Sequence, residues 1–154
     1  GVTNYAGVED AVAVTQGWFM DFPASKERNL GQAVLLGDIV TFTSYIPSLD
    51  PCEFEGTSNL WALSYNTGTA YSDSVIGLDA SDTVTLDGID HSRVLKSISL
   101  GKGFSLTPNV HVGRQEGSKA YIQTSTGAIE AISQANPGIV KSGKLSWEDE
   151  SVLD

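Results

Sequence analysis

The sequence predicts an all-β protein made of antiparallel meander units. Strands of period two, rich in apolar and β-branched residues, alternate with turns that contain glycine. The clearest strand opens residues 60–71, where Leu60 and Ala62 point to one side and Trp61 and Leu63 to the other. Because both sides are apolar, we expect this strand to lie between two layers of the fold.

The N-terminal part contains one predicted strand. Residues 1–15 are weakly patterned and form either an irregular lead-in or a short helix within residues 8–14. Residues 16–22 predict a strand rich in aromatic side chains, which Pro23 ends because proline cannot donate to a β-ladder. A polar loop follows at residues 24–29.

The first meander unit has the strongest turn signals. Residues 31–36 and 39–46 are two apolar, β-branched arms around Gly-Asp, which predicts a hairpin. After the strand that starts at Leu60, residues 66–68 (Asn-Thr-Gly) predict a second turn, because glycine adopts positive φ without strain. We expect a return strand from this turn that reaches about Ile76.

A second unit repeats the pattern downstream. Residues 93–100 predict a strand, which the sequence Gly-Lys-Gly after it interrupts. The expected parts beyond it are a meander at 104–132, its hairpin tip at 114–118, a turn at Thr126-Gly127 and a last strand at 143–148. We therefore expect a single all-β domain over residues 16–149, followed by an acidic tail at residues 150–154.

Charge is distributed unevenly along the chain. The 154 residues have a formal net charge of −10, and no Lys or Arg lies between Arg28 and Arg93, where nine Asp or Glu residues fall. A solvated acidic surface is one interpretation, and divalent-cation binding or docking of a basic partner is the other. Nucleic acid is excluded as the expected partner, because phosphate binding needs a stripe of basic residues.

Two further features bear on the environment of the protein. Its single cysteine, Cys52, forms no internal disulfide, so it is either a free buried thiol or half of a bridge to another chain. No apolar run approaches the length that spans a membrane.

Residues suited to catalysis are few. His91 and His111 are far apart in sequence, and no Gly-x-Ser-x-Gly motif or zinc-type Cys/His spacing occurs. Residues 77–92 are rich in Asp but lack the spacing and closing Glu of an EF-hand loop. Glu53 and Glu55 are expected in an exposed loop, and Trp18, Trp61 and Trp147 in the packing of sheets. We therefore expect no catalytic residue and no cofactor, and leave calcium open.

The meander units resemble blades of a quinoprotein-type β-propeller. Residues 60–68 reproduce the segment Leu-x-Ala-Leu-x-x-x-Thr-Gly that recurs in such blades. A closer resemblance, over residues 17–147, is to the C-terminal end of PilY-type proteins, which are type IV pilus biogenesis factors and tip-associated adhesins. The segments that carry it are Gly17-Trp-Phe-Met-Asp-Phe, Glu27-Arg28, Val40-Thr-Phe-Thr-Ser, Ile46-Pro-Ser, Asp50-Pro-Cys, Gly56-Thr-Ser, Leu60-Trp-Ala-Leu, Thr67-Gly-Thr-Ala-Tyr, Ser125-Thr-Gly and Ser146-Trp.

This resemblance implies an extracellular bacterial protein that acts in pilus assembly and adhesion without catalysis. It implies about two blades of a partial propeller, whose open sheet edges pair with pilins, with the rest of a propeller or with copies of the chain. The calcium-binding Asp-rich loop of the family is not reproduced. Two alternatives remain: a scaffold or assembly propeller of the cell envelope, and part of a quinoprotein-like enzyme.

Overall fold

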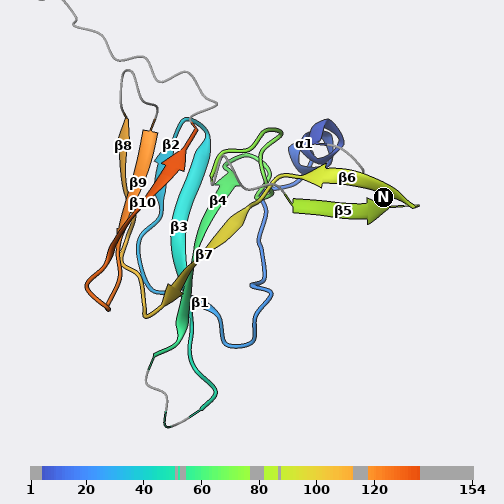
Figure 1. Cartoon of the computed structure of the whole chain (residues 1–154). Coiled ribbons are helices and arrows are strands. Elements are labelled where there is room, and N and C mark those ends of the chain that lie inside the picture. Colours follow the sequence, from blue (N-terminus) through green and yellow to red (C-terminus); the bar gives the residue numbers. More distant parts are fainter. Residues whose placement is uncertain are drawn as a thin grey trace, which may run out of the picture.

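A computed structural model describes residues 5–50, 52, 55–76, 82–86, 88–112 and 118–135. Within these residues the protein is mostly β, with one short helix, α1 (Tyr5–Ala13), and two antiparallel sheets (Figure 1). Neither sheet closes on itself or curls within this part of the chain. The predicted antiparallel β architecture is confirmed in its coarse form: the described residues are mostly β, and the region expected as lead-in or helix contains a helix.

The first sheet is organised around β3 (Ile39–Ile46) and β4 (Thr57–Ser64), which pair along their whole length. The other edge of β3 is shared by β1 (Arg28–Asn29), at the end of β3 near Tyr45, and β2 (Val34–Leu36), at its beginning. The outer edge of β4 pairs with β7 (Ser97–Lys102).

The predicted hairpin at residues 31–46 is confirmed. β2 and β3 are joined at Gly37 and Asp38, whose φ angles are 56° and 66°. Two consecutive residues with positive φ are typical of the type I′ turn, whose twist matches that of a two-stranded hairpin. Asp38 adopts this conformation although it has a side chain, which Asp and Asn tolerate better than most residues.

Both faces of β4 are buried, as the sequence predicts. On one face Leu60 packs with Ala120 and Ile122 of the second sheet. On the other face Trp61 and Leu63 pack with Phe42 of β3. The rings of Trp61 and Phe42 are nearly parallel, with an interplanar angle of 7° and centroids 6.3 Å apart.

The predicted strand at residues 16–22 is wrong, although its alternation is correct. This segment forms no β-ladder but lies over the face of the first sheet that carries Trp61. Trp18, Met20 and Phe22 point into that face, and Phe19 between them is exposed. The alternation of buried and exposed side chains therefore arises here because an extended segment lies over the face of a sheet, and not because the segment is a strand of that sheet.

The predicted return strand up to Ile76 is also wrong. The turn at 66–68 does form, with Gly68 at φ 68° and the Ser64 N–H donating to the Thr69 carbonyl at 2.8 Å. Beyond it the described residues leave the sheet, and Ile76 makes only an isolated bridge to Gln134. The place beside β4 is taken by β7.

β7 differs from the strand expected at residues 93–100. It starts at Ser97 and runs through Gly101, where a bulge leaves Leu100 without a partner in the register. Gly101 has φ 81°, so it bends the strand rather than ending it. Arg93 belongs to a separate hairpin of β5 (Asp82–Leu86) and β6 (Ile89–Arg93), which lies beyond the first sheet (Figure 1).

The second sheet has the predicted meander order. β9 (Ser118–Gln123) lies between β8 (Asn109–Val112) and β10 (Ile129–Gln134), and the turn before β10 contains Gly127 at φ 87°. The expected hairpin tip at 114–118 falls, except for Ser118, outside the described residues. The expected strand at 143–148 and the acidic tail at 150–154 also lie outside them.

The contact between Gly68 and Trp18 gives a test of this packing. A Cβ at Gly68 would overlap the Trp18 indole, whereas a Cβ at Gly127 would meet open space. Both positions have positive φ, so Gly127→Ala should lower the free energy of unfolding by roughly 1–2 kcal/mol through backbone strain alone. Gly68→Ala should lower it by about 1–3 kcal/mol more, because the indole must move.

Urea unfolding of the two variants measures this difference. Equal losses would contradict the packing of Trp18 against the turn.

Candidate functional site

The residues that the sequence offered for catalysis do not come together. His111 is exposed on β8, and His91 lies on β6 in the separate hairpin. Glu55 is exposed just before β4, and Glu53 lies outside the described residues. Nothing in this arrangement pairs a base with a nucleophile.

The Asp-rich stretch at residues 77–92 is partly described. Asp82 lies opposite Arg93 in the β5–β6 register, and Asp90 lies opposite Thr85. Asp79 and Asp87 lie outside the described residues. Across the part of the chain that the structure describes, no three His, Cys, Asp or Glu residues gather closely enough to hold a metal ion.

Trp18 and Trp61 serve packing, as expected. Trp61 is fully buried and its indole N–H donates to the Ser44 hydroxyl at 2.8 Å. Trp18 is half-buried, and its N–H donates to the Tyr65 carbonyl at 2.8 Å, which ties the N-terminal segment to the turn after β4. Trp147 lies outside the described residues.

One functional-looking group was missed by sequence reasoning. Glu27, in the segment expected to be a polar loop, is buried. Its carboxylate accepts hydrogen bonds from the Ser44 hydroxyl and, at 3.2 Å, from the Asn59 amide. Ser44 in turn accepts the Trp61 N–H. The network links the loop to β3 and β4, and no local pattern in the sequence marks it, since its members are 17 and 32 residues from Glu27.

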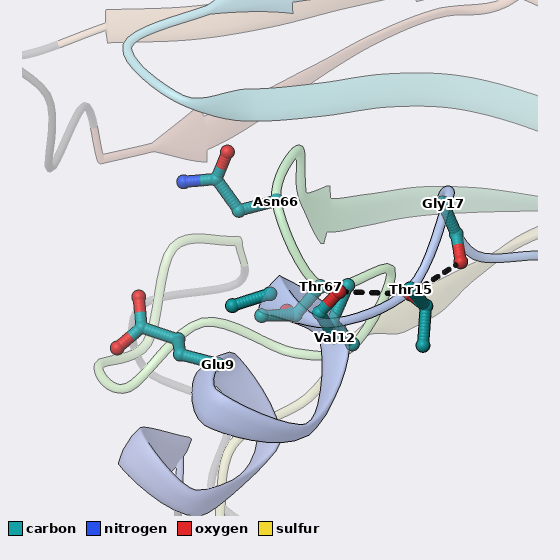
Figure 2. Close-up of a pocket in the computed structure, with 7 residues that line it drawn as sticks. Glu9, Val12, Thr15, Gly17, Asn66 and Thr67 are labelled. Carbon is teal, nitrogen blue, oxygen red and sulfur yellow. Dashed lines mark hydrogen bonds between the residues drawn. The ribbon is translucent and has the colours of Figure 1, made fainter.

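A hollow of about 450 Å³ lies between the end of α1 and the turn after β4 (Figure 2). Its lining residues are Glu9, Val12, Ala13, Thr15, Gly17, Asn66 and Thr67. The Thr15 hydroxyl donates to the carbonyls of Val12, at 2.8 Å, and Gly17, at 3.0 Å, and so closes the C-terminal end of the helix. Glu9 is the charged group among the lining residues and is exposed.

Further carboxylates lie around the same end of the first sheet. Burial raises the pKa of Tyr71 above its ordinary value of 10.0, and the nearby Tyr5 phenol and the charges of Asp38, Glu9 and Asp73 raise this pKa further. The rings of Tyr5 and Tyr71 have centroids 5.4 Å apart. The negative charges of Glu9, Asp38 and Asp73 all act on this phenol, which makes this end of the molecule electronegative.

A second hollow of about 480 Å³ borders β7. It is lined by Pro23, Trp61, Ala70, Val94, Leu95, Lys96 and Ser97. The Lys96 ammonium lies 5.7 Å from the centroid of the Trp61 ring, within the range of a cation–π contact. This lysine therefore already has a partner in the protein, and the hollow lacks the several convergent polar groups that orient a ligand.

The edges of the sheets are the remaining candidate site. Among the described strands, β7 pairs only with β4, β8 only with β9, and β10 only with β9. The outer edge of β10 is covered at one end, where the Ala135 N–H donates to the Val75 carbonyl at 2.7 Å. An unpaired edge of this kind is a template for another strand.

Cys52, for which the sequence left two alternatives, is exposed and not in a disulfide within the chain. The alternative of a buried thiol is wrong. Its backbone N–H donates to the Asp50 carboxylate at 2.8 Å, an Asx turn that holds the loop between β3 and β4.

No protein-family model, curated protein or solved structure matches this chain. A search of the described residues finds no helix that is both long and apolar enough to cross a membrane.

The raised pKa of Tyr71 predicts a loss of stability in alkali. The folded protein holds the phenol proton more tightly than the unfolded chain, so the free energy of unfolding should fall as the pH rises through and above 10.0. Tyr71→Phe removes the phenol proton, so the free energy of unfolding of this variant should fall less with rising pH than that of the wild type. Tyr65→Phe, which alters an exposed tyrosine, is the matched control and should behave as the wild type.

Urea unfolding between about pH 8 and about pH 11 measures the effect. The same pH dependence in wild type and Tyr71→Phe would contradict it.

Proposed function

We propose that this chain is a non-enzymatic, extracellular component of a type IV pilus or a related surface fibre, and that it acts through strand-edge association. The resemblance of residues 17–147 to the C-terminal end of PilY-type proteins supports the pilus assignment. The observation that carries the mechanism is the set of sheet edges on β7, β8 and β10, each paired on one side only among the described strands.

The arrangement of the strands supports a relation to propeller blades. β2, β3, β4 and β7 are successive neighbours in one antiparallel sheet, and β8, β9 and β10 form the next. The two sheets pack face to face through Leu60, Ala120 and Ile122, as neighbouring blades do. We infer that they are two blades of a partial propeller, with the β5–β6 hairpin inserted between β4 and β7.

The hydrogen bonds of β10 identify which groups its free edge presents. Backbone groups alternate in direction along a strand, and the Ala135 N–H points to the outer edge. The N–H groups of Ile129, Ala131 and Ser133 therefore point outward as well. The N–H groups of the even-numbered residues of β10 point toward β9. The backbone groups of Ala128, just before β10, point the same way, because its carbonyl accepts a hydrogen bond from the Thr124 N–H at 2.9 Å.

A scaffold propeller of the cell envelope is the second candidate, because the same edges would bind the strands of an envelope protein. Binding to type IV pilins distinguishes the two proposals. Binding of purified pilin subunits would support the pilus component, and binding of envelope proteins without pilins would support the scaffold.

Ala131→Pro tests the mechanism. Proline removes an outward N–H of β10 and leaves the bonds to β9 in place, so the fold should persist while strand addition at this edge is lost. Ala131→Val retains the N–H and is the control. In a pull-down with purified pilin subunits, we expect wild type and Ala131→Val to retain the pilin and Ala131→Pro to lose it.

Circular dichroism checks that both variants keep the β-sheet signal. Failure of the wild type to retain pilin would overturn the pilus assignment, and equal retention by a folded Ala131→Pro would overturn pairing at the β10 edge.

A further inference from the structure

Within the described residues, the face of the second sheet that points away from the first sheet is largely exposed and contains no carboxylate. Ala120 and Ile122 face the first sheet, so the odd-numbered residues of β8, β9 and β10 form the opposite face. We call these residues the outer face: Asn109, His111, Lys119, Tyr121, Gln123, Ile129, Ala131 and Ser133. Lys119 is half-buried and the others are exposed.

The outer face combines a basic corner with apolar side chains. Lys119 lies directly opposite His111 in the β8–β9 register. Tyr121 and Ile129 lie diagonally across β9 and β10 and are 40% and 69% exposed. Tyr121 lies between Lys119, its neighbour two residues along β9, and Ile129, its diagonal neighbour on β10, and exposed tyrosines are typical of protein interfaces.

Charge is segregated between two parts of the sequence. Residues 1–92 contain two basic and thirteen acidic residues, whereas residues 93–144, which include the second sheet, contain seven basic and two acidic residues. A surface without carboxylates is therefore unusual in a chain of net charge −10 and is complementary to the rest of the same chain.

The acidic counterpart is the end of the first sheet beside α1. We call it the acidic end: Glu9, Asp10, Asp38 and Asp73, all exposed. No Lys or Arg occurs in residues 5–25 or 29–92, so no basic residue of these segments neutralises it. The helix is held at the C-terminal end of β4, where the Tyr5 and Ser64 hydroxyls are 2.9 Å apart, so the acidic end lies at that end of the first sheet and is a different surface from the outer face.

We propose that the outer face binds the acidic end of a second copy of the chain, so that copies associate head to tail. Because the two surfaces are different parts of the molecule, the contact is heterologous, and a pair of copies keeps one free outer face and one free acidic end. Complementary charge supplies orientation, and Tyr121 and Ile129 supply apolar burial. This contact uses side chains of a sheet face, so it goes beyond the strand-edge association proposed above.

Charge reversal at one surface tests the contact. Lys119→Glu should raise the dissociation constant of self-association roughly tenfold, because it replaces attraction by repulsion. Lys26→Glu is the control: it gives the same net charge and alters an exposed lysine of the loop before β1. Glu9→Lys should weaken the contact from the other side, with Asp21→Lys, also exposed, as its control. Sedimentation velocity over a range of concentrations gives the constants.

A mixture of Lys119→Glu and Glu9→Lys decides the geometry. Each variant keeps the surface that the other has altered, so the mixture should associate more tightly than either variant does alone. Association of wild type should also weaken between about 0.05 M and about 0.5 M salt, since exposed charges are screened.

Three outcomes would overturn the proposal. They are a wild type that stays monomeric at all concentrations, association that Lys119→Glu leaves unchanged, and a mixture that forms no complex. Ala131 also lies on the outer face, but pairing through the β10 edge needs its N–H and is insensitive to salt. Loss of association in Ala131→Pro with no effect of Lys119→Glu would therefore assign self-association to the edge and reject the face contact.

Discussion

The pairing of β3 with β4 is the interaction on which the other elements depend. The strands are joined over Ile39–Ile46 and Thr57–Ser64, and each presents buried side chains to both faces. β1 and β2 attach to one edge of this pair and β7 to the other. The second sheet covers one face and residues 18–22 the other. Apolar burial on two sides makes this ladder the centre of the hydrophobic core.

Polar groups inside this core decide how the second sheet sits on the first. The Gln134 amide donates to the Thr41 hydroxyl at 3.1 Å. The Thr43 hydroxyl donates at 3.2 Å to the carbonyl of Leu106, whose N–H donates to the Gln123 carbonyl of β9 at 3.1 Å. A buried polar group without a partner costs about 1–3 kcal/mol, so a shifted arrangement would lose several of these bonds at once. Apolar packing brings the sheets together, and these bonds select one registration.

The same architecture leaves two kinds of surface through which the chain can associate. Sheet edges act through backbone groups, which depend little on side-chain identity or on salt. The association proposed for the outer face of the second sheet would use side chains, and the described residues of this face include no carboxylate, in contrast with the acidic end beside α1. The two surfaces follow from one cause. Among the described residues, the second sheet packs against the first through one face, and each of its outer strands pairs with one neighbour.

The sequence by itself determined the local features of this protein. The hairpin at Gly37-Asp38, the two apolar sides of β4 and the β8–β10 meander depend on side-chain alternation and turn residues that are adjacent in the chain. Only the tertiary structure decided where residues 16–22 and 69–76 lie, because an extended segment that covers a sheet and one that joins its edge have the same alternation. It also decided the burial of Glu27, whose partners Ser44 and Asn59 are distant in sequence, and it placed Glu9 and Asp38 near enough to Tyr71 for their charges to raise its pKa. The local sequence pattern specifies which side of a strand is apolar. Which segment packs against that side depends on how segments that are distant in sequence occupy the faces and edges of β3 and β4.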